Sequence, residues 1–207
     1  MLHVAACLWD ATKASQKFSL CYDESWAEKL YRGFARHLTM PFRFVLFTDR
    51  PRKFAEAIEQ EPLERKPPDY GCMIEPFRLN VPTIIVGLDT ILVRNIDHMA
   101  HYCLTQTRVA LPDHPTKADY GYINAVAFVP AGNRAVYDEW RGENDMEWLR
   151  KRDVNDALKL WPGQILSFRL QIGKGKPLPD DVRIVYFHGE QKPHALHNER
   201  WVQKAWR

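Results

Sequence analysis

The sequence predicts an α/β fold, in which a mixed and mostly parallel central sheet is flanked by helices in a single domain over residues 1–207. Two observations support this class. The β-branched run at residues 83–86 has no polar alternation, as is typical of a strand covered on both faces. We also expect a strand over residues 4–9, a helix over about 23–38 and a strand over 42–47, which is the order of a parallel βαβ unit.

The helix expected after the first strand has a start signal, a stop signal and an apolar face. Asp23 or Ser25 can cap its beginning, and Pro41 follows its end. Apolar side chains recur every four positions along this helix, as one face of an amphipathic helix requires. They are Trp26, Leu30, Phe34 and Leu38. We therefore expect this face to pack against the sheet.

The other elements are predicted from shorter signals. Residues 60–72 are rich in Pro, Glu and Lys and predict a loop, because Pro67-Pro68 is incompatible with regular structure. Asp97 is interpreted as the cap of a short helix. Later strands are expected over 108–111, 122–129, 164–168 and 182–187, and helices over 133–140, 145–150 and 201–206.

Composition narrows the functional class. A chain of 207 residues with 45% hydrophobic and 27% charged residues has the make-up of a soluble globular domain, and its net charge of +3 is too small to predict binding to nucleic acid or to an anionic membrane. We find no signal peptide, and no apolar run approaches the ~18 residues of a membrane span. The sequence contains no C-x-x-C pair, which indicates that its cysteines are free thiols in a reducing cytoplasm. These cysteines are Cys7, Cys21, Cys72 and Cys103.

The stretch at residues 83–93 places a carboxylate at the end of a predicted buried strand. Two apolar, β-branched runs flank the break at Gly87-Leu88-Asp89-Thr90. In open α/β folds, ligands bind at the edge of the sheet where the strands end. We therefore expect Asp89 to stand in a ligand site.

Three segments carry motifs in a fixed order along the chain, namely residues 87–97, 122–129 and 183–194, with a weaker fourth at 161–169. Together they resemble the small GT-A-fold glycosyltransferases, a group that includes glycogenin-like proteins and bacterial and phage nucleotide-sugar transferases. The first segment is similar to the strand with the family's Asp-x-Asp motif, and the second to its Asn-Ser-Gly-Val-Met-like strand. The third looks like its closing His-x-x-Gly-x-x-Lys-Pro-Trp segment, and the weaker one like the strand just before it.

The resemblance implies a nucleotide-diphosphate-sugar donor whose sugar is transferred to an acceptor hydroxyl. It also implies that residues 1–97 form a Rossmann-like nucleotide-binding half and residues 98–207 an acceptor-binding and closing half. Negative charge grows on the leaving diphosphate, so a fixed positive group must neutralise it. Mn²⁺ or Mg²⁺ held by carboxylate oxygens does this, and a Lys or Arg within hydrogen-bonding distance can share or replace that role.

Four residues are expected around the diphosphate, two of them through a direct match to the family. Asp89 matches the second Asp of the Asp-x-Asp motif and would ligate the metal, while Lys192 matches the lysine that reaches the diphosphate. His188 stands two residues beyond the position of the family's metal-binding His, where it is either a ligand or donor contact or an ordinary structural histidine. Gly189 allows close approach of the backbone to a phosphate. The basic loop at 173–177 is no P-loop, but it can bring further positive charge.

Other matched positions are expected to contact the donor. Asn124 matches a residue that hydrogen-bonds the donor sugar, and a buried structural Asn is the alternative. Asp145 matches a sugar contact or a base, although we favour a helix cap slightly. Thr48 and Asp49 are positioned like the loop that touches the nucleoside, with a simple turn as the alternative. Arg78 is the nearest cation to a position where the family often carries a lysine.

Three matched positions lack the family's chemistry, because Gly87 replaces the first Asp, Met146 replaces an amide and Tyr186 replaces the metal-binding His. One carboxylate and a diphosphate bind Mn²⁺ or Mg²⁺ weakly. We therefore predict a glycosyltransferase that is either metal-assisted or reliant on basic side chains. The alternative is a non-catalytic protein that binds a nucleotide sugar or carbohydrate. The acceptor is expected to contact the variable loops 60–72 and 112–121.

Overall fold

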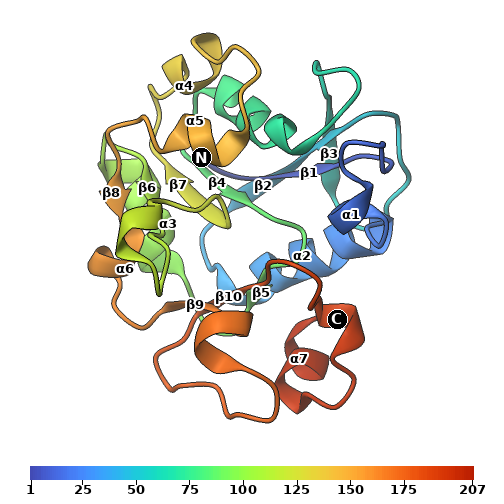
Figure 1. Ribbon diagram of the computed structural model, residues 1–207, viewed down its shortest axis with the longest axis vertical. Coiled ribbons are helices and arrows are strands. Elements are labelled where there is room, and N and C mark those ends of the chain that lie inside the picture. The colour runs from blue at the N-terminus through green and yellow to red at the C-terminus, as the bar shows by residue number, and fades with distance from the viewer.

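The computed structural model describes the backbone of residues 1–207 and every side chain except those of Phe18 and Ala118. Its centre is a seven-stranded sheet with the strand order β3-β2-β1-β4-β7-β6-β8 (Figure 1). The pairings are parallel except on the two sides of β7, which runs antiparallel to β4 and to β6. The predicted mixed and mostly parallel sheet is therefore confirmed. Its strands are β1 (Leu2–Leu8), β2 (Phe42–Thr48), β3 (Ile58–Pro62), β4 (Thr83–Val86), β6 (Ala110–Leu111), β7 (Val126–Val129) and β8 (Asn155–Asp156).

The expected βαβ unit opens the chain. β1 pairs in parallel with β2 along its whole length, and α1 (Gln16–Ser19) and α2 (Glu24–His37) lie between them in the sequence. Asp23 caps α2, since its carboxylate accepts a hydrogen bond from the backbone N–H of Ser25 at 3.0 Å. The predicted apolar face is buried at Trp26, Leu30, Phe34 and Leu38.

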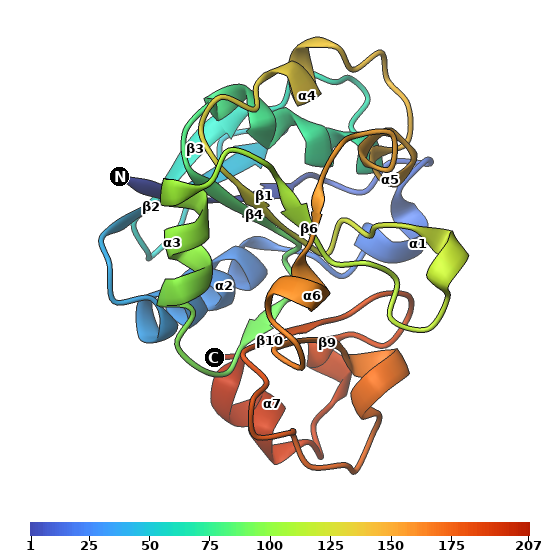
Figure 2. The ribbon, with the colours of Figure 1, turned by 90° about the vertical axis from the view of Figure 1, so that its left-hand side faces the viewer.

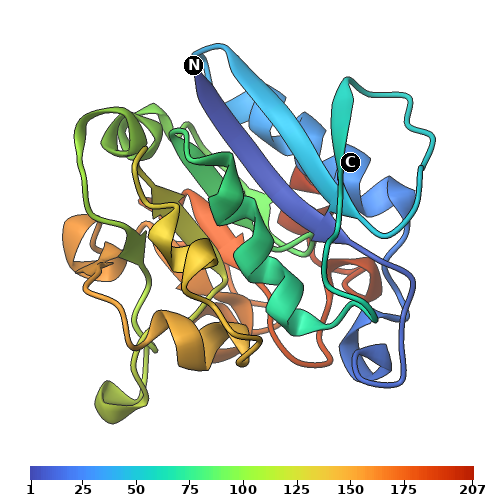
Figure 3. The ribbon, with the colours of Figure 1, turned by 90° about the horizontal axis from the view of Figure 1, so that it is seen from above.

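Helices cover both faces of this sheet, which explains its continuous apolar runs. Successive side chains of a strand point to opposite faces. Val4 and Ala6 of β1 accordingly pack in one apolar cluster with α2 and α3 (Asp97–Thr105), while Ala5 and Cys7 pack in another. Figures 2 and 3 show the sheet between these two layers. The second layer consists of the 3₁₀ helix η1 (Tyr70–Leu79), α4 (Ala135–Asp138) and α5 (Asp145–Leu149).

A second, three-stranded sheet is built from segments that are distant in the sequence, and it lies below the large sheet in Figure 1. β5 pairs antiparallel with β10, and β10 pairs in parallel with β9. Leu92 and Ile184 bury one side of this sheet in the cluster of α2, while its other side packs against η3 and α7. These elements are β5 (Ile91–Leu92), β9 (Ile165–Ser167), the π-helix η3 (Phe168–Ile172), β10 (Ile184–Tyr186) and α7 (Arg200–Ala205).

The stretch at 83–93 is therefore shared between two sheets. Its first apolar run is β4 of the large sheet, and its second run is β5 of the small one. Asp89 lies in the turn where the chain passes from one sheet to the other. This position brings it to the boundary between the two sheets.

The prediction of a loop over 60–72 is wrong at both ends. β3 extends to Pro62 as an edge strand beside β2, and η1 begins at Tyr70. Proline is tolerated on an edge strand because no further strand needs its missing N–H. η1 accommodates Pro76, and the carboxylate of the buried Glu75 accepts hydrogen bonds from the backbone N–H groups of Glu64 and Arg65.

The predicted cap at Asp97 is wrong, and the helix predicted over 133–140 starts later, because the side chains of Asp97 and Asn133 bind elsewhere. Asp97 is the first residue of α3, and its carboxylate accepts from the backbone N–H of Thr39 and the side chain of Asn95, at 2.8 Å each. Asn133 donates to the carbonyl oxygens of Thr107 and Pro130 at 3.0 and 2.9 Å, and α4 is shorter than predicted. The remaining short helices are η2 (Ala118–Tyr120), α6 (Ala157–Leu160) and η4 (Pro193–Ala195).

The four cysteines are free thiols, as the sequence predicts, while the cytoplasmic localisation stays a prediction. No helix in the described part of the chain has the length and hydrophobicity that crossing a membrane requires.

Candidate functional site

Several chain segments converge at one edge of the large sheet. β1 and β4 end there in parallel, and the antiparallel β7 begins there, directly after Asn124-Ala125. The backbone N–H of Gly87, which follows β4, donates to the carbonyl of Ala125 at 3.3 Å. Residues 187–189, which follow β10, line the same cavity as these strand ends. This is the edge at which open α/β folds bind ligands.

Asp89 and Lys192 form an ion pair at this edge, although they are 103 positions apart in the chain. Their side chains are only 11% and 7% exposed. The hydroxyl of Tyr22 donates to the same carboxylate oxygen, Oδ2, at 2.8 Å. Burial, and then the charge of Asp89, raises the pKa of Tyr22. The two residues assigned to one site thus meet in the fold, while their roles towards a donor stay predictions.

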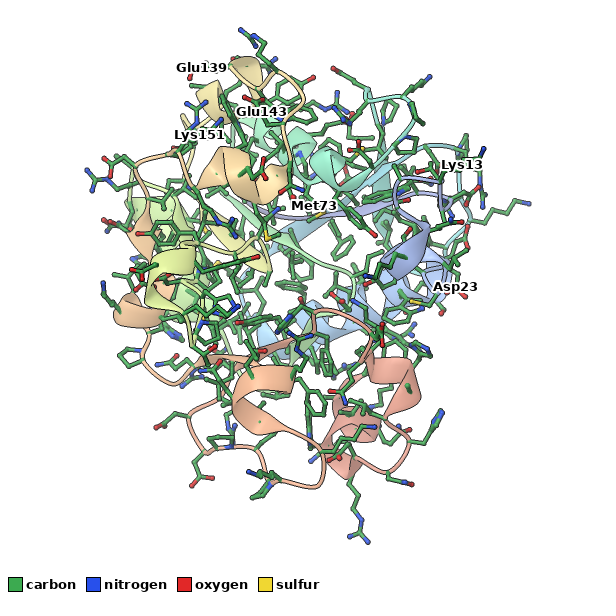
Figure 4. The ribbon with its side chains drawn as sticks, in the orientation of Figure 1. Lys13, Asp23, Met73, Glu139, Glu143 and Lys151 are labelled. Carbon is green, nitrogen blue, oxygen red and sulfur yellow. The ribbon has the colours of Figure 1, made fainter. Side chains whose placement is uncertain are left out.

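A cavity of about 350 Å³ opens beside this ion pair, within the roughly 300–1,000 Å³ typical of small-molecule sites. Figure 4 labels one of its lining residues, Met73, near the centre of the molecule. Its apolar lining also includes Cys7, Leu8, Trp9, Tyr70, Leu88 and Phe187. Its polar lining includes Asp89, Asn124, Asn144, Asp145, His188 and Lys192. We refer to it as the first cavity.

Asn124 and Asp145 form a second polar pair in this lining. Asn124 Nδ2 donates to Asp145 Oδ2 at 3.1 Å, and Asn124 Oδ1 is buried with no hydrogen-bond partner among the described residues. The cap of α5 is Asn144, whose side chain accepts from the backbone N–H groups of Met146 and Glu147. The interpretation of Asp145 as a helix cap is therefore wrong. Burial raises the pKa of Asp145, which makes its carboxylate a stronger proton acceptor.

A second cavity, of about 340 Å³, adjoins the first. The two share Gly87, Asp89, Asn124, Met146, Phe187 and His188. The segment between β6 and β7 adds His114, Pro115, Lys117 and Tyr120, and η3 adds Arg169 and Leu170. The variable loop 112–121 therefore borders the second cavity, whereas loop 60–72 contributes Tyr70 to the first.

His188 and Gly189 lie where the segment after β10 meets these cavities. His188 Nε2 shares a hydrogen bond with Ser167 Oγ at 2.9 Å. Burial, and then the charge of Arg169, lowers the pKa of His188. As strand periodicity predicts, the ring of His188 lies near that of Tyr186, with 6.0 Å between the ring centroids. Gly189 has a φ of +75°, and a Cβ added there would lie 3.1 Å from Arg169 Nη1, so a glycine suits this position.

Thr48 and Asp49 are not among the residues that line either cavity. The buried guanidinium of Arg52 donates to Thr48 Oγ1 and to Asp49 Oδ1 at 2.8 Å each. Asp49 Oδ2 accepts from the backbone N–H of Asp10 at 3.0 Å. These polar atoms are engaged within the protein, and their contact with a nucleoside stays a prediction that the geometry does not favour.

Arg78 and the basic loop at 173–177 also lie outside the lining of the two cavities. At the end of η1, Arg78 pairs with Glu64 at 2.9 Å and donates to the carbonyl of Pro62 at 2.6 Å. The structure therefore does not bring Arg78 to the expected diphosphate position. Among the described residues that line the first cavity, Lys192 is the one with a fixed positive charge.

The donor set around Asp89 does not fit a resident divalent cation, which needs about six hard ligands. Asp89 Oδ2 already accepts from Lys192 and Tyr22. Position 87 supplies no carboxylate, and a Cβ added to Gly87 would lie 3.0 Å from Asp89 Oδ1. Within the described part of the chain, no cluster of three or more His, Cys, Asp or Glu residues is arranged to hold a metal ion. The metal site expected from Asp89 and His188 is therefore not supported by this arrangement.

Sequence reasoning missed Tyr22, the aromatic lining and the basic residues of the second cavity. No sequence pattern links Tyr22 to Asp89, which is 67 positions away. Trp9 directly follows the first strand, so its place at the binding edge was an available signal. Lys117 and Arg169 lie in the segments 112–121 and 161–169, in which no sequence pattern marks either side chain as a ligand contact.

Comparison with solved structures finds chains of the same fold. One is the apo structure of WbbM, a bifunctional glycosyltransferase, with a TM-score of 0.58 at 8% sequence identity. The match covers 98% of this chain and 50% of WbbM, so this chain spans about half the length of that protein. No protein-family model and no curated protein matches the sequence. At this identity the likeness shows the fold alone, and the chain has a glycosyltransferase-like α/β fold.

Proposed function

We propose that this chain binds a nucleotide-diphosphate sugar and transfers the sugar to an acceptor hydroxyl. The observation that carries the proposal is the buried cluster of Asp89, Lys192 and Tyr22, which stands beside a cavity of ligand size in a glycosyltransferase-like fold. Nearly buried charges are costly to maintain and concentrate at functional sites. The cluster is therefore better explained by ligand binding than by stability alone.

The first cavity offers separate places for the two ends of such a donor. The rings of Trp9 and Tyr70, whose centroids lie 6.2 Å apart, provide an apolar surface for a nucleoside. Lys192 and the backbone at Gly189 are then available for the diphosphate. The carboxylate of Asp89 holds the ammonium group of Lys192 in position. Tyr22 supports this arrangement, because its hydroxyl donates to the same carboxylate oxygen.

In the transfer step, the bond between the anomeric carbon and the diphosphate oxygen breaks and its electron pair leaves with the nucleotide diphosphate. We propose that Lys192 stabilises this growing negative charge, a role that a positioned ammonium performs without a metal ion. Asp145 is the candidate base for the acceptor hydroxyl, because burial raises its pKa and Asn124 fixes its orientation.

A second candidate function is non-catalytic binding of the same donor. The observation that favours it is the lack of a carboxylate at Gly87, where the resembling enzymes carry a metal ligand. Tyr186 adds to this, since it is buried in place of the expected metal-binding His.

A panel of nucleotide-diphosphate sugars tests the proposal. Each donor is added to the protein in EDTA and in Mn²⁺, and both the melting temperature and the release of free nucleotide diphosphate are measured. At a donor concentration of 100 times the Kd we expect stabilisation by about 2.7 kcal/mol in EDTA, together with slow hydrolysis of the donor. Stabilisation without nucleotide release over many hours favours the binding protein. No stabilisation by any donor contradicts both functions.

A further inference from the structure

The second cavity carries positive charge that the donor site does not use. Lys117 and Arg169 line it, and the guanidinium of Arg150 lies 4.3 Å from the ring centroid of Tyr120 in the same lining. In the described part of the chain, neither Lys117 nor Arg169 forms a salt bridge. Two cations without a carboxylate partner at the wall of a cavity attract an anionic ligand.

The carboxylates near this cavity offset only part of that charge. Asp89 lines it, but its Oδ2 is engaged by Lys192 and Tyr22. Asp113 is not part of the lining, and its side chain accepts from the backbone N–H of His114 at 2.7 Å. The cavity is therefore more basic than acidic.

The histidines of the lining respond to the same positive charge. Burial, and then Lys117, lowers the pKa of His114, while Asp113 raises it, and Arg150 and Arg169 make smaller contributions that lower it. Burial, and then Arg169, lowers the pKa of His188. Both effects agree with the geometry of the cavity.

The lining also offers neutral groups that suit a sugar. Asn124 belongs to the lining of both cavities, and its Oδ1 is buried with no hydrogen-bond partner among the described residues. It can accept a hydrogen bond from a hydroxyl at the junction of the cavities. The ring of Tyr120 supplies an aromatic surface, and the volume of about 340 Å³ lies within the range of small-ligand sites.

Resting on the proposed function, we infer that the second cavity holds a saccharide acceptor that carries an anionic group, a phosphate or a carboxylate, bound by Lys117 and Arg169. The hydroxyl that reacts lies at the junction, beside Asn124. Its oxygen forms the new bond to the anomeric carbon as the bond to the diphosphate oxygen breaks. Its proton passes to Asp145 and then to water, and the nucleotide diphosphate leaves with the electron pair.

Calorimetric titration of the protein tests this inference directly, without a donor. The probes are glucose 6-phosphate, glucuronate, neutral glucose and inorganic phosphate. The variants are Lys117→Gln and Arg169→Gln, with Lys13→Gln and Arg200→Gln as matched controls on exposed positions outside both cavities. Figure 4 shows Lys13 at the edge of the molecule, directed outward.

We expect at least one of the two anionic sugars to bind more tightly than glucose and than inorganic phosphate. Each cavity variant should weaken that binding roughly tenfold, because each removes a charge-assisted hydrogen bond, while the controls leave it unchanged. Equal binding of glucose and the anionic sugars, or equal losses in the control variants, overturns the inference. Inorganic phosphate that binds as tightly as glucose 6-phosphate also overturns it, since the sugar is then not recognised.

The donor panel separates this inference from the proposed function. If the cavity variants abolish stabilisation by nucleotide-diphosphate sugars while no anionic sugar binds, the second cavity holds the diphosphate of the donor, and the acceptor inference fails alone. If anionic sugars bind as expected but no donor stabilises the protein, the proposed transfer function is contradicted. The second cavity is then an anionic-sugar site in a protein that does not use a nucleotide-sugar donor.

Discussion

Replacing Lys192 with Met removes the charge from a nearly buried ion pair and keeps a side chain of similar length. Asp89 then retains the hydrogen bond from Tyr22 at 2.8 Å, but it loses its cation in a place where its side chain is only 11% exposed. Breaking a buried pair by removing one partner costs about 3–5 kcal/mol. Because Tyr22 still binds the carboxylate, we expect the free energy of unfolding at pH 7 to fall by about 3 kcal/mol, at the lower end of that range.

Urea unfolding followed by tryptophan fluorescence measures this change. For a chain of this size, a loss of that magnitude lowers the melting temperature by roughly 6–12 °C. The double variant Asp89→Asn/Lys192→Met leaves no unpaired charge, so it should be more stable than Lys192→Met alone. The double-mutant cycle should give a coupling of roughly 2 kcal/mol between the two side chains.

The exposed ion pair of Arg43 and Glu59 provides a matched control, since its side chains are 51% and 45% exposed. Glu59→Gln should cost no more than about 1 kcal/mol. The reasoning is refuted if Lys192→Met costs no more than this control, or if Asp89→Asn does not restore stability in the double variant.

Three further predictions concern pH, metal and catalysis. Hydrogen bonding to Arg50 lowers the pKa of Asp10 to about 2, so its contribution to stability is present above the unfolded pKa of about 3.9 and lost as the pH falls through 2. The stability difference between wild type and Asp10→Asn, measured by urea unfolding, should therefore be full at pH 6 and small near pH 2. Gly87→Asp places a second carboxylate beside Asp89 and should destabilise the protein by about 1–3 kcal/mol, part of which Mn²⁺ restores in a thermal melt. Asp145→Asn should lower kcat about 10²-fold or more in a transfer assay while the donor KM stays within a few-fold.

Each of these predictions has a contrary result. A difference for Asp10→Asn that is independent of pH means that the arginine contact does not lower the carboxyl pKa. Equal stabilisation of wild type and Gly87→Asp by Mn²⁺ means that Asp89 already holds a metal ion. Unchanged kcat in Asp145→Asn removes this carboxylate from the role of base.

The layers of the fold could be predicted from the sequence because their signals are local. β1, β2 and β4 contain apolar runs at residues 4–8, 44–47 and 84–86, and α2 has both a cap at Asp23 and a four-residue apolar repeat. β3 was missed because its sequence, Ile-Glu-Gln-Glu-Pro, is that of a polar edge strand, which pairs on one side only. η1 was missed because Pro67-Pro68 before it and Pro76 within it oppose a regular helix, although Asp69 caps its start by accepting from the backbone N–H of Gly71.

The site could be predicted only in part. Asp89 and Lys192 were found through the order of motifs, but their direct ion pair depends on the turn between the two sheets and on Tyr22. Asn144 caps α5, and Asp145 therefore lines the cavity. Both residues are of types that cap helices, and the local sequence does not decide which of them does so.

The affinity of the best donor for wild type and for Lys192→Met, measured by calorimetry in EDTA, tests the central claim most directly. We predict that wild type binds without added metal and that Lys192→Met binds at least about tenfold more weakly, because the diphosphate loses a charge-assisted hydrogen bond. Lys13→Gln serves as the control and should bind like wild type. Equal affinity of wild type and Lys192→Met, or binding that requires Mn²⁺, would contradict the claim that Lys192 is the cation of this site.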